Sequence, residues 1–179
     1  MTRNLFSDPI ILTPHRADWE HLAQAEIRRL RESLVDIPIS DIQHIGSTAI
    51  RGIRAKPILD IQLLVAGPSH FPGIITAVQA LGYEYWADNP NTAQLFFVKG
   101  RPPHGKGRTH HVHVLYDSEK FEDAVLFRDA LNGDPALAME YEALKLELAA
   151  KYATQREAYT EGKTAFVTDV VRNARWATA

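Results

Sequence analysis

Residues 42–65 constrain the fold of this chain more than any other stretch, because they predict two strands joined through a polar turn and a short basic connection. An apolar, strand-like run ends at residue 45, and a second apolar run occupies residues 58–65. Between them lies a turn that offers backbone N–H groups and hydroxyls, formed by Gly46, Ser47 and Thr48. Such a turn is suited to hold a small anion, so we expect phosphate-binding donors beside a β-sheet.

The second predicted strand carries two polar side chains on one face. Because successive residues of a strand point to opposite faces, Asp60 and Gln62 lie together, on the side opposite Ile61. An acid and an amide within an apolar strand cost stability unless they are paired, hydrogen-bonded or bound to a metal. A carboxylate next to a phosphate-binding turn predicts a site for a metal-complexed phosphate compound.

Residues 110–116, with the sequence His-His-Val-His-Val-Leu-Tyr, predict a further strand with two histidines on one face. His111 and His113 could ligate one divalent ion, and Asp60 could supply a third ligand from a nearby strand. The alternative is that both are ordinary hydrogen-bonded histidines beside a polar cleft. Magnesium prefers oxygen ligands whereas imidazole suits zinc, manganese or nickel, so histidine ligands would shift the preferred ion from Mg²⁺ toward Mn²⁺ or Zn²⁺.

Residues 99–109 hold four basic residues, no acid, three glycines and two prolines. This composition predicts an exposed, mobile loop, because it is too polar and too broken to pack. Two interpretations stay open. The loop is either a solubilising hairpin connection or a flexible clamp on phosphate that leads directly into the histidine strand.

The remaining chain predicts an α+β fold. Apolar spacing indicates a helix after Asp18 and a short helix at residues 71–81, and strand-like runs follow at residues 83–86 and 94–99. Strand, helix and further strands fit a mixed sheet with helices against one face.

From residue 118 onward the sequence predicts three helices. Asp18, Ser118 and Asp134 are expected to cap helices, and residues 154–157 have the pattern of a capping box. We therefore expect an α/β core with an N-terminal arm at residues 1–117. C-terminal helices at residues 118–179 would pack on this core as one compact unit.

The central motifs resemble those of the GrpB family. The resemblance rests on His-Ile-Gly-Ser-Thr-Ala-Ile at residues 44–50 and Ala-Lys-Pro-Ile-Leu-Asp-Ile at residues 55–61, and it extends through the His-Val-His run and the C-terminal helices. Where that family usually has Val-Pro-Gly, this chain has Ile50, Arg51 and Gly52. The family in turn resembles the nucleotidyltransferase superfamily typified by polymerase beta. This implies a nucleotidyltransferase-like mixed β-sheet with helices on one face, followed by a C-terminal helical segment.

The resemblance also implies roles for individual residues. The superfamily has two carboxylates on the strand after the turn; Asp60 matches the first and is the implied catalytic metal ligand, whereas Gln62 stands in place of the second. The implied phosphate-binding residues are Gly46, Ser47, Thr48, Lys56, Arg101 and Lys145, with Lys163 as an alternative on a C-terminal helix, and the other residues expected in the cleft are His44 and Gln62.

Three functions fit these features. The first is a nucleotidyltransferase-like enzyme that acts on a nucleotide or another phosphate compound in a metal-dependent cleft. The second is a non-catalytic module that binds a nucleotide or coenzyme, which the missing second carboxylate favours; GrpB-like domains also occur joined to dephospho-coenzyme A kinase. The third is a metal-dependent hydrolase built on Asp60, His111 and His113.

Composition excludes several other classes of protein. A formal net charge of -2 argues against a protein that coats nucleic acid, and any such contact would need a local basic patch. The absence of cysteine excludes disulfides and thiolate chemistry. Because the chain has neither a secretory signal pattern nor an apolar run near membrane-spanning length, we expect a cytoplasmic protein with no membrane partner.

Overall fold

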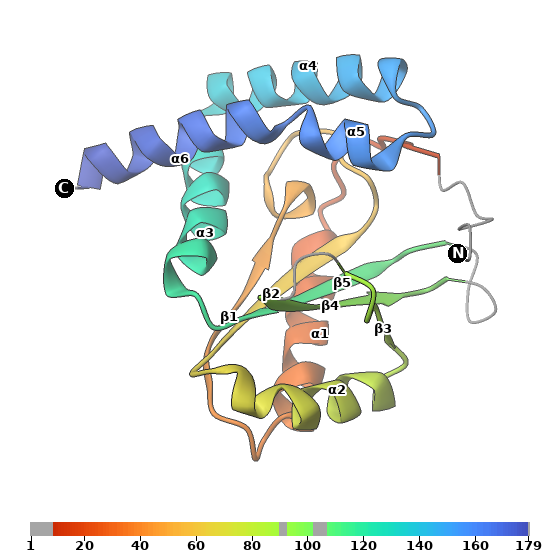
Figure 1. Cartoon of the computed structure of the whole chain (residues 1–179). Helices are drawn as coiled ribbons and strands as arrows, with labels where there is room; N and C mark the ends of the chain where they lie inside the picture. The colour runs from red at the N-terminus through yellow and green to blue at the C-terminus, as the bar shows by residue number, and fades with distance from the viewer. Residues whose placement is uncertain (1–8, 90–92, 102–106, 179) are drawn as a thin grey trace.

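The computed structural model describes residues 9–89, 93–101 and 107–178, and these build a five-stranded mixed sheet with helices on both sides (Figure 1). The strands are β1 Ile39–Ile45, β2 Leu59–Val65, β3 Glu84–Tyr85, β4 Gln94–Lys99 and β5 His110–Leu115. Their order is β1-β2-β5-β4-β3, with β2 and β5 parallel and the other pairs antiparallel. The α+β class and the mixed sheet predicted from the sequence are confirmed.

One face of the sheet packs against the helices α1 Trp19–Ser33 and α2 Phe71–Ala80. Alternate residues of β2 that include Ile61 and Leu63 are fully buried there, as strand alternation predicts. On α1, Arg28 and Arg31 are exposed whereas Ala23, Ile27 and Leu30 are buried, as the apolar spacing predicts.

The C-terminal part of the chain forms four helices in the described residues, one more than predicted. They are α3 Ser118–Gly133, α4 Pro135–Lys151, α5 Arg156–Glu161 and α6 Thr164–Thr178. The predicted last helix is divided at Gly162, where a Cβ would lie 2.6 Å from Cδ2 of Leu148. A glycine is therefore needed where α5 and α6 meet against α4.

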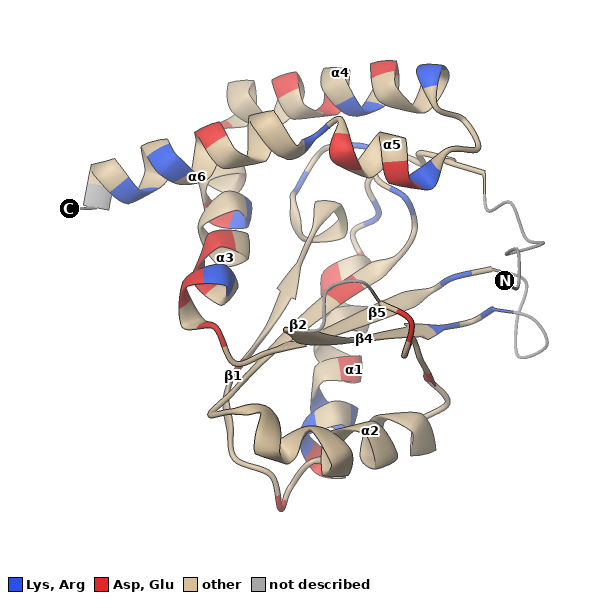
Figure 2. Ribbon diagram, in the orientation of Figure 1, with Lys and Arg blue, Asp and Glu red and all other residues tan. Residues whose placement is uncertain are grey.

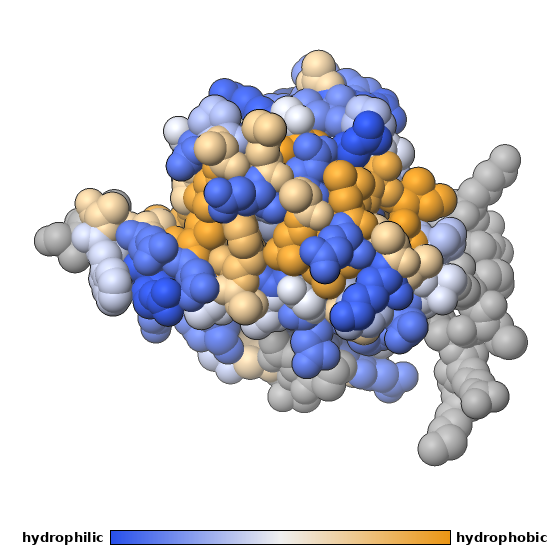
Figure 3. Space-filling model, turned by 90° about the horizontal axis from the view of Figure 1, so that it is seen from above, coloured by the Kyte–Doolittle hydropathy of each residue, from blue (hydrophilic) through white to orange (hydrophobic). Residues whose placement is uncertain are grey.

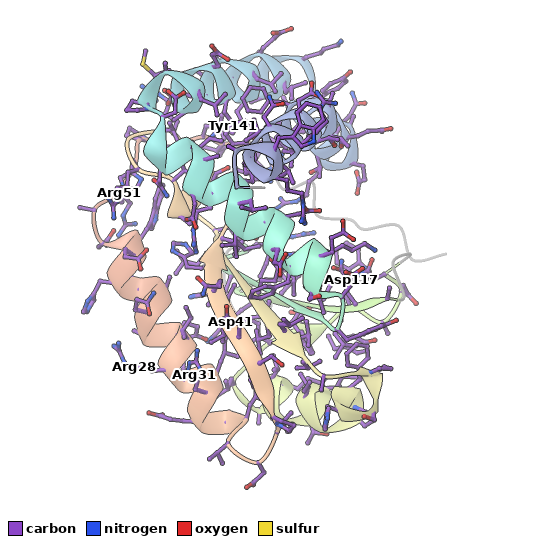
Figure 4. All side chains as sticks on the ribbon, turned by 90° about the vertical axis from the view of Figure 1, so that its left-hand side faces the viewer. Arg28, Arg31, Asp41, Arg51, Asp117 and Tyr141 are labelled. Atoms are coloured by element: carbon purple, nitrogen blue, oxygen red, sulfur yellow. The ribbon has the colours of Figure 1, made fainter. Side chains whose placement is uncertain are left out.

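These helices cover the side of the sheet opposite α1 and α2, and they enclose their own apolar cluster. Ile50 and Ile53, from the connection between β1 and β2, pack against Phe127, Leu131 and Tyr141. Figure 4 shows Tyr141 among the C-terminal helices. The connection that carries the polar turn is thus held between the sheet and the C-terminal helices.

The outer surface of the C-terminal helices is mixed in character. Figure 3 looks onto them from above and shows hydrophobic residues interspersed with hydrophilic ones. The exposed apolar side chains include Met139 and Leu146 on α4 and Trp176 on α6. In the described residues, none of the helices has the length and apolar character needed to cross a bilayer.

The predicted caps have mixed outcomes. Asp134 caps α4 as predicted, because its Oδ1 accepts from the backbone N–H groups of Ala136 and Leu137 at 2.9 and 3.1 Å. The prediction for Ser118 is wrong by one residue: Asp117 caps α3 by accepting from the Lys120 N–H at 3.1 Å. An acid one residue earlier has the right backbone geometry, so the serine becomes the first helical residue.

The other two predicted caps form no side-chain cap bond. Asp18 stands at the N-cap position of α1, but its carboxylate pairs with Arg16 instead. The capping box at residues 154–157 is wrong, because Gln155 is the N-cap of α5 and caps no N–H with its side chain. In the predicted N-terminal arm, Thr13 forms an isolated antiparallel bridge to Ala55.

Candidate metal and phosphate site

Three metal-ligating side chains meet on β2 and β5. The parallel register pairs Asp60 with His111 and Gln62 with His113, so Asp60 and both histidines point to the face opposite α1 and α2. Nδ1 of His111 donates to Oδ1 of Asp60 at 2.8 Å, and Nε2 of His113 lies 3.9 Å from the same oxygen. One donor atom from each of the three lies within 4.8 Å of the other two, so the cluster could hold a metal ion.

The protonation states suit a cation. Burial alone would raise the pKa of the Asp60 carboxyl, but the hydrogen bond from His111, with the His113 imidazole nearby, holds that pKa well below its usual range. Burial lowers the pKa of His111 more than the Asp60 carboxylate raises it. At neutral pH the cluster therefore contains a carboxylate and a neutral His111 imidazole, which are the forms that bind metals.

The donor set fits one transition-metal ion better than a magnesium pair. Two imidazoles and one carboxylate match the ligand preferences of zinc or manganese, whereas magnesium prefers oxygen ligands. Among the described residues, Nε2 of His111 is buried without a hydrogen-bond partner, so this nitrogen has a lone pair that an ion could use. Gln62, in place of a second carboxylate, is only 3% exposed, and its Oε1 is likewise without a partner in the described part of the chain.

A cavity of about 700 Å³ opens beside this cluster. It lies between the sheet, the connection from β1 to β2 and the α5–α6 region; Figure 2 shows basic residues on the connection and both acidic and basic residues on α5. Its lining includes Gly46, Ser47, Lys56, Asp60, Trp86, Phe96, Arg108, His111, His113, Tyr141, Arg156, Glu157, Tyr159, Glu161 and Lys163. The candidate metal ligands, a polar turn and side chains of both charges thus share one cavity.

Six of the predicted site residues are brought together at this cavity: Gly46, Ser47, Lys56, Asp60, His111 and His113. The aromatic wall of Phe96 packs against both histidines, with ring centroids 5.1 and 4.8 Å apart. Arg108, at the end of the predicted basic loop, also lines the cavity, while residues 102–106 of that loop lie outside the described residues.

The other predicted residues lie elsewhere. His44 and Thr48 line a second cavity of about 640 Å³, where Nε2 of His44 is 3.0 Å from Oγ1 of Thr48 and Nδ1 faces Glu20 at 3.2 Å. Strand alternation explains this, because His44 pairs in register with Ile61, whose side chain faces away from Asp60. Gln62 shares a face with Asp60 but is not part of the cavity lining.

Two predicted phosphate ligands are occupied by other contacts. Lys145 is fully buried and its Nζ donates to the carbonyl of Arg54, outside the cavity lining. Arg101 forms an ion pair with Glu84 at 3.8 Å, also away from the cavity. Lys145 thus ties α4 to the connection between the strands, and Lys163, the alternative lysine, lies in the cavity instead.

The C-terminal helices contribute a cationic wall that the sequence interpretation largely missed. Arg156, Tyr159 and Lys163 all line the cavity. The ammonium of Lys163 lies 4.7 Å from the Tyr159 ring centroid, and the ammonium of Lys56 lies 5.0 Å from the same centroid. Arg156 and Tyr159 lie on α5 and Lys163 lies in the turn between α5 and α6, so no single helical spacing in the sequence relates the three.

Comparison with known proteins places the chain in a family. A family model described as GrpB protein matches residues 9–173. A UPF0157 protein of Pseudomonas aeruginosa is 43% identical over 178 residues, which cover 98% of this chain and 72% of that protein. The glutamate-rich protein GrpB of Alkalihalophilus pseudofirmus is 33% identical over 164 residues, which cover 90% of this chain and 94% of that protein.

Two further comparisons concern a solved structure and a longer protein. The crystal structure of conserved protein GrpB from Enterococcus faecalis superimposes with a TM-score of 0.79 at 28% identity, covering 92% of this chain and 96% of that one. A dephospho-CoA kinase of Mycolicibacterium paratuberculosis is 27% identical over 195 residues, covering 97% of this chain but 48% of the kinase. From the family model and the relatives at 43% and 33% identity, we conclude that this chain is a member of the GrpB protein family.

Proposed function

We propose that the cavity binds a nucleotide or another phosphate compound together with one divalent metal ion, and that it supports nucleotidyl transfer. The observation that carries this proposal is the convergence of Asp60, His111 and His113 on a cavity that also contains the Gly46–Ser47 turn and several cationic side chains. A metal ion bound there would neutralise phosphate charge and polarise the phosphorus centre.

Other residues that line the cavity would bind the phosphate groups and the base. Ser47 and the backbone of Gly46 face the cavity and would hold phosphate oxygens, as a turn with free N–H groups does. Lys56, Arg108 and Lys163 would balance the charge that the ion leaves uncompensated. The aromatic side chains Trp86 and Phe96 offer an apolar wall against which a base could stack.

A relative that is named for an activity supports the ligand class. The dephospho-CoA kinase of Mycolicibacterium paratuberculosis contains a region similar to nearly all of this chain. A nucleotide-containing coenzyme is therefore a reasonable ligand to include beside the common nucleotides.

The proposal is tested first by metal and nucleotide binding. Purified protein is titrated with Mn²⁺, Zn²⁺ and Mg²⁺ by calorimetry, and then with nucleotides in the presence of the preferred ion, with pyrophosphate release as the activity readout. Asp60→Asn removes the charge of the central ligand and should weaken metal binding by about a hundredfold or more. Asp36→Asn, an exposed acid far from the cluster in sequence, serves as the matched control.

A wild-type protein that binds no divalent ion in these titrations would contradict the proposal. The proposal would also be contradicted if Asp60→Asn and Asp36→Asn bound metal and nucleotide equally well.

A second function, a binding module without catalysis, is favoured by one observation. The position of a second carboxylate is held by Gln62, a buried amide that does not line the cavity, so the chain offers ligands for one ion rather than two. Two ions ordinarily stabilise the attacking and leaving oxygens of phosphoryl transfer. Nucleotide binding that depends on metal, without any pyrophosphate release, would select this second function.

A further inference from the structure

The second cavity, of about 640 Å³, lies beside the turn that borders the metal cluster. Gly46 and Ser47 line the cavity of the metal cluster, whereas Thr48 and Ala49 line the second one. Among the described residues, the two cavities have no lining residue in common. The second cavity takes its walls mainly from α1, β1 and α3, and Figure 4 shows α1 and α3 on either side of β1. It is therefore a separate site, which the proposed function does not use.

Side chains of both charges line the second cavity. Its acids are Glu20 on α1 and Asp129 on α3, and its arginines are Arg51 in the connection from β1 to β2 and Arg128 on α3. The Arg128 guanidinium donates from Nε to Oδ1 of Asp129 at 2.7 Å and from Nη1 to the carbonyl of His44 at 2.9 Å. Arg128 and Asp129 are thus engaged with the wall and with each other, which leaves the charges of Glu20 and Arg51 for a ligand.

Arg51 supplies the positive charge. Its backbone N–H donates to Oδ1 of Asn132 at 2.9 Å, which holds the residue against α3. Within the described part of the chain, the Arg51 guanidinium forms no ion pair, and the side chain is exposed at the cavity. A guanidinium in this setting can bind a carboxylate through two parallel hydrogen bonds.

Glu20 supplies the negative charge. Its Oε1 accepts from Nε2 of Gln24 at 2.9 Å, and its Oε2 lies 3.2 Å from Nδ1 of His44. Burial would raise the pKa of Glu20, but these hydrogen bonds and the charge of Arg128 lower it. Burial lowers the pKa of His44 although Glu20 opposes this, so at neutral pH the imidazole is neutral and does not cancel the charge of the carboxylate. The Glu20 side chain is 65% exposed and can therefore contact a ligand.

We propose that the second cavity binds a small zwitterion with one carboxylate and one ammonium group, of the kind found in free amino acids. Arg51 would bind the carboxylate, and Glu20 would bind the ammonium group. An anion alone would be repelled by Glu20 and Asp129, and a cation alone would be repelled by Arg51 and Arg128. A zwitterion compensates both available charges, and such electrostatic complementarity gives specificity.

The rest of the lining suits the body of such a molecule. Ala17, Ile42 and Ala49 offer apolar surface to a short hydrocarbon chain. Nδ1 of His15 is buried and has no hydrogen-bond partner among the described residues, so it is available to a polar group of the ligand. A volume of about 640 Å³ lies within the range of small-molecule sites.

The test is calorimetric titration in the presence of a chelator, so that the outcome does not depend on the metal site. The probes are glycine, γ-aminobutyrate and ε-aminocaproate, which differ in the number of methylene groups between their two charges. Butyrate and butylamine, which carry one charge each, are the reference probes. At least one zwitterion should bind about tenfold more tightly than either reference probe, because it forms one more hydrogen-bonded contact between charged groups.

Arg51→Gln and Glu20→Gln should each weaken binding of the preferred zwitterion by about tenfold. The matched controls are Arg54→Gln and Glu32→Gln, which should bind it as the wild type does. Arg54 lies in the same connection but pairs with Glu142 at 3.9 Å, and Glu32 is an exposed acid on α1; neither lines the second cavity. Circular dichroism checks that all four variants fold.

Zwitterions that bind no more tightly than butyrate and butylamine would overturn the inference. So would binding that survives in both Arg51→Gln and Glu20→Gln, or that weakens as much in the two control variants. The proposed function fails with a different signature, in which the wild type binds no divalent ion but still binds a zwitterion through Arg51 and Glu20. Conversely, metal-dependent nucleotide binding without zwitterion binding would retain the proposed function and reject the second site.

Discussion

Oδ2 of Asp60 lies 2.6 Å from the position that a Cβ on Gly46 would occupy. The backbone of the turn is therefore in direct contact with the carboxylate that anchors the metal cluster. Gly46 also has a φ of 73°, in the region that only glycine adopts easily. The turn and the metal ligand are thus positioned by one residue that has no side chain.

Gly46→Ala should damage the metal site more than the fold. The positive φ costs about 1–2 kcal/mol for a residue with a Cβ, and the new methyl group would also displace the Asp60 carboxylate. Gly52→Ala is the matched control, because Gly52 has a φ of 78° but nothing within 4 Å of its Cβ position. Both variants should lose similar stability in urea unfolding, whereas calorimetry should find weakened Mn²⁺ binding in Gly46→Ala alone. Equal metal affinities in the two variants would contradict this.

Ser47 and Thr48 are adjacent in sequence, but of the two only Ser47 should affect phosphate binding. Ser47→Ala should weaken phosphate binding, because Ser47 lines the cavity, and should cost some stability as well, because the Ser47 side chain also hydrogen-bonds the buried Tyr141. Thr48→Val should cost about 1–2 kcal/mol of stability, because it removes two buried hydrogen bonds. Oγ1 of Thr48 lies 3.0 Å from Nε2 of His44 and donates to the Ile58 carbonyl at 3.1 Å. Urea unfolding and tripolyphosphate titration of both variants check this division, and a Thr48→Val protein with normal stability and lost anion binding would refute it.

Gln62→Asp should not create a second metal site. The amide is 3% exposed beneath the cavity, so a carboxylate there would be buried near Asp60 and its pKa would rise. We expect one Mn²⁺ per chain in both wild type and variant, and a loss of about 1–3 kcal/mol of stability. Gln62→Met, which removes a polar atom that has no partner among the described residues, should be neutral or stabilising. Two ions bound per chain in Gln62→Asp would show that position 62 does face the metal.

The stability of the metal-free protein should rise with pH above neutrality. Burial lowers the pKa of both Lys56 and Lys145 to about 7, whereas the unfolded chain keeps the ordinary value of 10.5. Between these values the unfolded state binds more protons than the folded state, so the free energy of unfolding increases with pH across this window. Urea unfolding at pH 7 and pH 9 measures the change. It should shrink in Lys56→Gln, and a stability that falls with pH over this window would contradict the assignment.

The sequence predicted that Asp60, His111 and His113 would meet, because strand alternation is a strong constraint. Alternation assigns each of these side chains to a face of its own strand. Asp60 and His111 then meet if the two strands are neighbours, and β2 and β5 pair in parallel with Asp60 opposite His111. The same alternation would have excluded His44 from the cavity, had its register against β2 been known. Register between strands depends on tertiary packing, which the local pattern does not specify.

The cationic wall was harder to predict because helix packing decides which lysine reaches the cavity. Lys145 and Lys163 both follow amphipathic helical patterns, and the sequence interpretation preferred Lys145. The break at Gly162 brings Lys163 to the cavity, whereas Lys145 satisfies a backbone carbonyl of the connection. The packing of α4, α5 and α6 determines whether Lys145 or Lys163 reaches the cavity. The spacing of residues in the sequence does not specify this packing.

The parallel pairing of β2 and β5 also gives the metal site a particular place in folding. Asp60 and His111 are 51 residues apart in the chain and come together only when these two central strands pair. An ion that binds this cluster would therefore bind the folded sheet and not the unfolded chain, and it would stabilise the parallel pairing of β2 with β5. Among the described residues the α5–α6 segment contributes no side chain to this cluster, so loss of packing at that segment should leave the three candidate metal ligands in place.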